Sequence, residues 1–142
     1  MSLDREPVKV NYALRIAKQY YDESTYNHAL RVMQFIADNE MIPMEYKEEC
    51  IALAIMHDLC EDTAYEGDEL PNNFRVALAL LTKPKYMNYI DYIQRIKDSS
   101  DASSGKCAWW VKLADMKDHL SQTETLTDRL KEKYLAALLI LL

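Results

Sequence analysis

The chain has 142 residues, of which 49% are hydrophobic and 28% are charged, and this composition excludes a disordered chain. That length fits one domain spanning residues 1–142. Only two glycines and four prolines argue against many tight β-turns, so we expect an all-α fold. Acidic residues outnumber basic ones by 23 to 17, and the formal net charge of -6 disfavours generic nucleic-acid binding. An anionic ligand therefore needs a local cation.

From the sequence we expect neither a membrane-spanning segment nor a leader segment. It begins MSLDREPVKVNY without an apolar stretch, and the longest apolar runs, Ile51–Met56 and Leu135–Leu142, are far shorter than the ~20 residues that cross a membrane. We therefore expect a cytoplasmic protein with no membrane partner. Cys50, Cys60 and Cys107 are odd in number and widely spaced, so we assign neither a disulfide nor a zinc cluster.

Hydrophobic periodicity predicts three helices in the first half of the chain. The first covers Val8–Tyr21, and the second follows with Ser24 or Thr25 as its N-cap. Pro43 opens the third helix, which contains the run Ile51–Met56. Because this run is apolar on every face, the third helix should be the central, buried one.

Four further helices follow in the second half. They are separated by an acidic loop at Thr63–Leu70 and by a loop-like stretch at Ser99–Gly105. We expect them from Pro71 to about Leu81, at Tyr86–Lys97, at Lys106–Leu120, and from about Thr127 to Leu142. The apolar end of the last helix either completes the core or forms a subunit contact, which would make the protein a homodimer.

Four ionisable residues directly follow the most apolar run: His57, Asp58, Glu61 and Asp62. If the third helix continues through them, they cluster over one end of that helix, because residues four apart share a face. Burying such groups without partners costs several kcal/mol, which metal coordination or a full hydrogen-bond network can offset. The alternative is a polar helix end that emerges into solvent.

Two further residues extend this pattern. His28 lies on the apolar side of the second helix, and Asp115 follows the mostly apolar segment Val111–Ala114. One histidine, a His-Asp pair and a later aspartate on separate helices are typical ligands of manganese, iron or zinc. Such a set leaves coordination positions open, as a catalytic metal requires. Taken alone, His28 also fits a hydrogen-bonded core histidine.

Three segments together resemble a known family: Tyr-Asn-His28, His-Asp-Leu-Cys-Glu-Asp-Thr at 57–63, and Val-Lys-Leu-Ala-Asp at 111–115. They resemble the HD superfamily of metal-dependent phosphohydrolases, over about residues 10 to 120. The chain is most similar to the alarmone hydrolase domain of the RelA/SpoT enzymes and to its small stand-alone relatives. The resemblance implies a single all-α HD domain of six to seven helices. It also implies an enzyme that hydrolyses a phosphorylated nucleotide, most specifically a guanosine 3′,5′-bis(diphosphate) 3′-pyrophosphohydrolase.

The resemblance also assigns roles to individual residues. It implies a divalent metal, manganese first and iron, zinc or magnesium otherwise, with the ligands His28, His57, Asp58 and Asp115. It further implies that Glu61 and Asp62 act around the nucleophilic water. Elementary chemistry agrees, because a carboxylate beside a water of lowered pKa can orient that water or accept its proton.

The chain departs from the family pattern on the substrate side. Relatives carry an Arg-Lys element where this chain reads Lys18–Tyr21, and they often have His and Asn where it has Asp118 and His119. His119 lies one turn after Asp115, so we expect it to contact substrate phosphate or ribose; the alternative is an exposed histidine at a helix end. We expect Lys112 to bind phosphate or to pair with the site carboxylates, unless it is a solvated surface lysine.

Two other functions stay open. The first is a nucleoside monophosphate phosphatase, which similar HD proteins perform with the same kind of metal site. The second is a non-catalytic nucleotide-binding or interaction module that keeps the scaffold, and a purely structural metal site is its simplest form. Against the second, a site without a chemical task has no evident reason to hold so many buried charges.

Overall fold

The computed structural model describes residues 8–142, and this part of the chain contains helices and no strand. Seven helices have nine residues or more and an eighth, α4, has four, so the predicted all-α bundle of six to seven helices is confirmed. They are α1 Val10–Tyr20, α2 Glu23–Asp38, α3 Met44–Met56, α4 Leu59–Asp62, α5 Asn72–Leu80, α6 Tyr89–Asp98, α7 Ser103–Ser121 and α8 Asp128–Leu141. The expected absence of a leader concerns mainly residues 1–7, which lie outside the described part.

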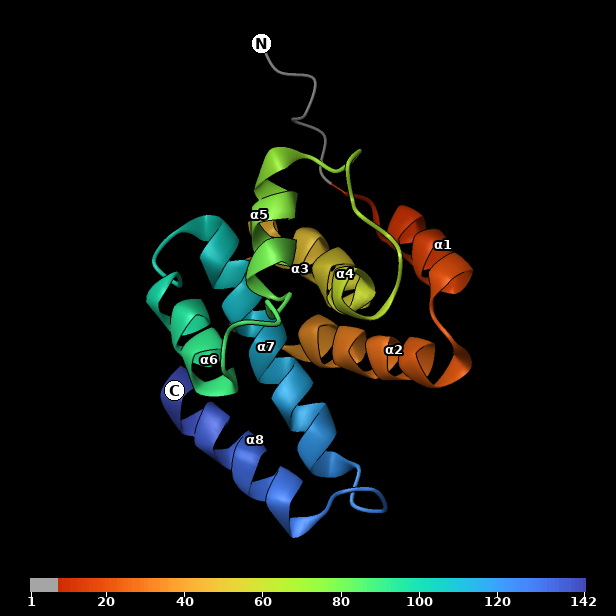
Figure 1. Ribbon diagram of the computed structural model, residues 1–142. Helices are drawn as coiled ribbons and strands as arrows, with labels where there is room; N and C mark the ends of the chain where they lie inside the picture. The colour runs from red at the N-terminus through yellow and green to blue at the C-terminus, as the bar shows by residue number, and fades with distance from the viewer. Residues whose placement is uncertain (1–7) are drawn as a thin grey trace.

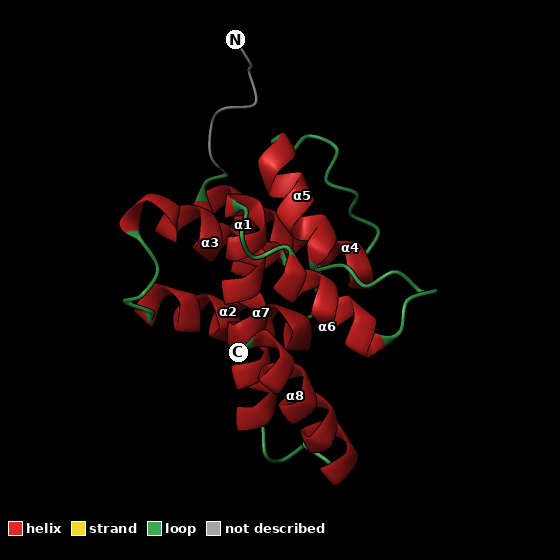
Figure 2. Ribbon diagram, turned by 90° about the vertical axis from the view of Figure 1, so that its left-hand side faces the viewer, coloured by secondary structure: helices red, strands yellow, loops and turns green. Residues whose placement is uncertain are grey.

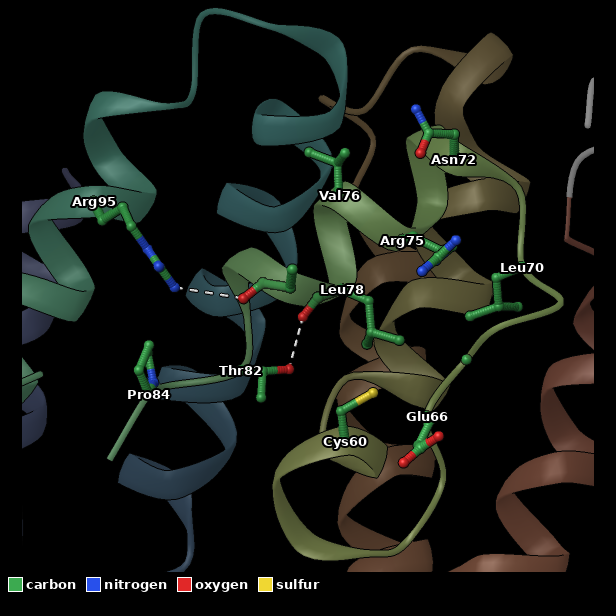
Figure 3. Close-up of a pocket in the computed structure, with 12 residues that line it drawn as sticks. Cys60, Glu66, Leu70, Asn72, Arg75, Val76, Leu78, Thr82, Pro84 and Arg95 are labelled. Carbon is green, nitrogen blue, oxygen red and sulfur yellow. Dashed lines mark hydrogen bonds between the residues drawn. The ribbon is translucent and has the colours of Figure 1, made fainter. Parts of the chain in front are cut away.

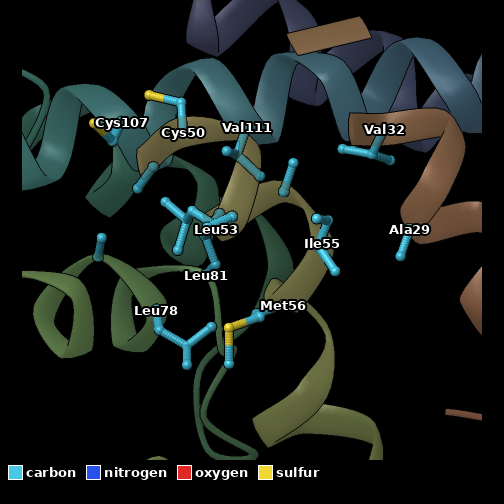
Figure 4. Close-up of a cluster of buried hydrophobic side chains, with 14 of the residues drawn as sticks. Ala29, Val32, Cys50, Leu53, Ile55, Met56, Leu78, Leu81, Cys107 and Val111 are labelled. Atoms are coloured by element: carbon cyan, nitrogen blue, oxygen red, sulfur yellow. The ribbon is translucent and has the colours of Figure 1, made fainter. Parts of the chain in front are cut away.

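Helix α3 is the centre of the bundle, as its apolar run predicts. It packs against α1, α2, α5 and α7 (Figure 1). Residues 52–56 have no exposed surface. Figure 4 shows Leu53, Ile55 and Met56 among side chains from neighbouring helices, including Val32 of α2 and Val111 of α7. Helix α8 packs on α6 and α7 at the end of the molecule away from α5 (Figures 1 and 2).

The start of α2 differs from the prediction. Its N-cap is Asp22 rather than Ser24 or Thr25, and Asp22 Oδ1 accepts the N–H of Thr25 at 2.8 Å. A carboxylate at this position satisfies a free amide and also interacts favourably with the positive end of the helix dipole, which explains why it prevails over the hydroxyl residues.

The third helix does not continue unbroken through the ionisable residues. Helix α3 ends at Met56, and α4 begins after Asp58. Side chains form hydrogen bonds with the backbone carbonyl groups at the break. His57 Nδ1 lies 2.6 Å from Ala54 O, and the Tyr21 hydroxyl donates to Ile55 O at 2.9 Å. The same hydroxyl accepts the N–H of Asp58 at 3.1 Å. The break therefore replaces backbone hydrogen bonds with side-chain ones.

The stretch predicted as a loop at Ser99–Gly105 contains the first turn of α7, which begins at Ser103 rather than at Lys106. A Cβ at Gly105 would lie 1.7 Å from the backbone oxygen of Ser99. Gly105 therefore permits a close approach between the end of α6 and the start of α7. The serine-rich composition suggested a loop and concealed this packing role.

Helix α8 begins where the sequence predicts, with Thr127 as its N-cap. Within residues 8–142, no helix has the length and apolar character that crossing a membrane requires. Leu141 at the end of α8 is buried, whereas Leu139 and Leu142 are 76% and 73% exposed. The tail thus contributes to the core and leaves apolar surface outside, and the homodimer stays a prediction for sedimentation to test.

Candidate metal centre

Three parts of the chain bring the four predicted ligands together. His28 comes from α2, His57 and Asp58 from the break between α3 and α4, and Asp115 from α7. Asp115 Oδ1 lies 2.8 Å from His28 Nε2 and 3.3 Å from His57 Nε2. Asp58 Oδ2 lies 3.2 Å from His57 Nε2 and 3.7 Å from His28 Nε2. The four side chains therefore point at one small volume.

Both histidines present the same nitrogen to this volume. His57 Nδ1 faces the Ala54 carbonyl at 2.6 Å, and a carbonyl can only accept, so Nδ1 carries a proton. His28 Nδ1 likewise faces Asp118 Oδ2 at 2.6 Å. Partners of this kind fix the imidazole tautomer and leave Nε2 available as a metal ligand.

The donor set fits a divalent cation. In the neutral imidazoles the Nε2 lone pairs would face the oxygens of Asp58 and Asp115, an arrangement of acceptors that is repulsive unless a cation or a proton lies between them. The ligand atoms of His28, His57 and Asp58 all lie within 4.8 Å of one another, and so do those of His28, Asp115 and His119. Imidazole nitrogen combined with carboxylate oxygen suits manganese, iron or zinc.

Electrostatics without a metal point the same way. Burial lowers the pKa of His57, but the carboxylates of Asp58 and Asp115 more than offset this and raise it to about 9. Burial also lowers the pKa of His28, but the hydrogen bond that Asp115 accepts and the charge of Asp115 outweigh this effect, so the pKa of His28 is raised. Both shifts have the same cause: the neighbouring carboxylates favour positive charge at the imidazoles, as they would favour a cation between them.

Lys112 lies beside the centre and is 8% exposed. Its Nζ donates to Asp115 Oδ2 at 2.9 Å and lies 5.0 Å from the centre of the Tyr92 ring. Burial lowers the pKa of Lys112, but the charge of Asp115 outweighs it and holds the pKa well above its ordinary value. Lys112 is therefore paired with a site carboxylate, which was one of its predicted roles. It is not a solvated surface lysine.

Glu61 and Asp62 are exposed and line a cavity of about 250 Å³ together with Asp58 and Asp115. Glu61 Oε2 accepts the backbone N–H of Lys83 at 2.9 Å, so one of its oxygens is fixed. The pKa of Asp62 is raised, mainly by its partial burial and to a lesser extent by the negative charges of Asp58 and Glu61. The cavity therefore places both predicted catalytic carboxylates next to the candidate centre.

His119 separates this cavity from a second one. Its Nε2 lies 3.3 Å from Asp115 Oδ1, and its ring stacks on Tyr134 of α8 with the centroids 4.6 Å apart. The second cavity measures about 360 Å³, and polar side chains line it, including Asn27, Arg31, Gln122 and Thr125. His119 is thus packed at the centre, where it can contact a substrate or offer a further nitrogen ligand.

Sequence reasoning missed two residues that position the candidate ligands. Asp118 is 1% exposed, and besides His28 it accepts the Nε–H of Arg31 at 2.8 Å. It lies one turn from Asp115 on the same helix face, a spacing that could have revealed it. Tyr21, which bridges the break before Asp58, contacts a segment over thirty residues away and leaves no local pattern in the sequence.

A further cavity lies away from the candidate centre. It measures about 630 Å³, and its walls include Cys60, Leu70, Leu78 and Arg95 (Figure 3). None of the four candidate ligands lines it. Cys60 faces this cavity while the next residue, Glu61, lines the one at the candidate centre, so α4 forms a wall between them.

Comparison of the chain with models of known protein families gave no match, and a search among curated proteins also found no relative.

Proposed function

We propose that this chain is a metal-dependent phosphohydrolase of the HD type, with a divalent ion, manganese first, held by His28, His57, Asp58 and Asp115. One observation carries the proposal. Two imidazoles, each with Nδ1 held by a hydrogen-bond acceptor, direct Nε2 at two carboxylates in a largely buried pocket. This arrangement matches a transition-metal site with ordered outer partners.

When bound, a divalent ion supplies Lewis acidity toward a phosphate oxygen and a lowered pKa of water. The chain's own residues supply the remaining steps. Glu61, fixed through one oxygen by the Lys83 amide, has a second oxygen with which to orient the attacking water and accept its proton. Asp62 lies beside it on the same wall and stabilises the transferred proton. Attack of the water on phosphorus then breaks the bond to the leaving group.

The two cavities on either side of His119 support a phosphorylated nucleotide as the substrate. The smaller one holds the catalytic carboxylates and lysines, and it suits the phosphate that is cleaved. The larger one offers the amides of Asn27 and Gln122 and the hydroxyl of Thr125 to a nucleoside. The most specific version, guanosine 3′,5′-bis(diphosphate), rests on the resemblance of residues 57–63 and 111–115.

Product-resolved hydrolysis tests this function. The manganese-loaded protein would be given guanosine tetraphosphate and a panel of nucleoside monophosphates, with Asp58→Ala as the inactive variant. Asp68→Ala, an exposed aspartate of the acidic loop, is the matched control. We expect pyrophosphate from the alarmone, produced by the control and abolished in Asp58→Ala. Orthophosphate from the monophosphates would select the phosphatase instead, and no turnover by metal-loaded protein would favour the non-catalytic module.

A further inference from the structure

The cavity at the candidate centre carries an excess of negative charge. Four carboxylates and three lysines line it: Asp58, Glu61, Asp62 and Asp115, and Lys83, Lys112 and Lys133. The chain as a whole has a formal net charge of -6. A phosphate that enters this cavity needs a cationic partner from the chain in addition to a metal, because the surrounding field repels it.

Two of the three lysines already have partners. Lys112 Nζ is paired with Asp115 Oδ2 at 2.9 Å. Lys83 Nζ donates to the backbone oxygens of Pro84 at 3.2 Å and Met87 at 2.8 Å. These contacts occupy N–H groups that could otherwise donate hydrogen bonds to a phosphate.

Lys133 differs from both. Within residues 8–142 its ammonium has no carboxylate or carbonyl partner, and it lies 4.2 Å from the centre of the Tyr89 ring and 5.8 Å from that of Tyr134. The face of an aromatic ring attracts an ammonium group through its quadrupole and leaves N–H donors available for an anion. Lys133 is exposed, so it keeps this charge in the open part of the cavity.

The position of Lys133 is defined by the fold. Helix α8 packs on α6 and α7, and its N-cap Thr127 accepts the N–H of Leu130 at 3.1 Å. The next residue, Tyr134, stacks on His119 with an interplanar angle of 14°. This segment of α8 therefore packs against the candidate centre. It lies outside the residues that carry the family resemblance.

We propose that Lys133 is a phosphate-binding residue of this site, whose ammonium receives a phosphate oxygen of the substrate on the side of the cavity formed by α8. The inference rests on the proposed function, since it takes the substrate to be a phosphate compound. It assigns to α8 a contribution to substrate binding.

Inorganic phosphate is the probe for the first test. Its binding to the manganese-loaded protein would be measured by calorimetry for the wild type, Lys133→Met, Lys133→Arg and the control Lys131→Met, an exposed lysine of the same helix. Because a hydrogen bond to a charged group contributes about 1.5–3 kcal/mol, we expect about tenfold or greater weakening in Lys133→Met. Lys133→Arg should retain most of the affinity, and manganese affinity should be the same in all four proteins.

Turnover is the second measurement. It distinguishes a failure of the proposed role of Lys133 from a failure of the proposed phosphohydrolase function. On an active substrate, Lys133→Met should raise KM more than it lowers kcat. Equal phosphate affinity in Lys133→Met and Lys131→Met, or no phosphate binding by the wild type at millimolar concentration, would overturn the role of Lys133. A wild type that hydrolyses nucleotides in either case keeps the proposed function. Phosphate held through Lys133 without any hydrolysis keeps the inference and removes the function.

Discussion

The candidate site has two sides that differ in their relation to solvent. The buried side consists of His28, His57, Asp115 and Asp118, whose charges have partners within the fold. The open side consists of Glu61, Asp62 and Lys133, which are exposed. A charge on the buried side has to be matched in place, by a metal, a proton or a neighbouring side chain, whereas water solvates a charge on the open side. Substitutions on the buried side should therefore change stability and metal binding together. Those on the open side should change catalysis or substrate binding and leave stability and metal binding unchanged.

Asp115→Ala should have the largest effect. It removes a candidate ligand and leaves the buried ammonium of Lys112 without its carboxylate. Breaking a buried ion pair from one side costs about 3–5 kcal/mol, so we expect a loss of that order in the free energy of unfolding and no measurable manganese binding. Denaturant titration with and without manganese would show both changes.

The double variant Lys112→Met with Asp115→Ala separates the two losses. It removes both buried charges, so it should recover much of the stability and none of the manganese binding. Manganese binding by the double variant would contradict the role of Asp115 as a ligand. Failure to recover stability would show that the ion pair is not the cause of the loss.

Glu61→Gln examines the open side. We expect turnover to fall by about 10²–10⁴-fold, because the amide cannot accept the proton of the water. Manganese affinity and thermal stability should be unchanged, since Glu61 is exposed and an amide oxygen can still accept the N–H of Lys83. Glu66→Gln, another exposed glutamate, is the matched control. Turnover retained in full by Glu61→Gln would remove Glu61 from the mechanism.

Asp118→Ala returns to the buried side, one contact away from the candidate metal. His28 would lose the acceptor that orients its ring, and outer partners of this kind typically contribute 10- to 100-fold in metal affinity. We expect a loss in that range by direct titration with manganese. Asp118→Asn, whose amide oxygen can still accept from Nδ1, should recover part of it. Equal affinities in the wild type and both variants would show that Asp118 serves only Arg31.

The sequence predicted those parts of the molecule that depend on local pattern. The apolar run before His57 identified the buried helix α3. The residue types of His28, His57 and Asp115 on separate helices, with the family resemblance of their segments, suggested a common site. What it could not predict depends on contacts between distant segments. At the break between α3 and α4 the Tyr21 hydroxyl occupies a carbonyl of α3. At the start of α7, Ser99 O lies so close to Gly105 that no Cβ would fit there. Neither contact has a periodicity that a single sequence displays.

Tyr21→Phe tests that long-range contact and should have the smallest effect of the series. The Tyr21 hydroxyl donates to Ile55 O and accepts the N–H of Asp58, so its removal leaves two polar groups without a partner beside the candidate ligands. The cost should be about 1–3 kcal/mol in the free energy of unfolding. Because Tyr21 holds the backbone of Asp58 and not its carboxylate, manganese affinity should fall by less than in Asp118→Ala, about tenfold or less.

Tyr20→Phe is the control, since Tyr20 is 38% exposed. Lower stability with unchanged manganese affinity would mean that the hydroxyl stabilises the break without positioning Asp58.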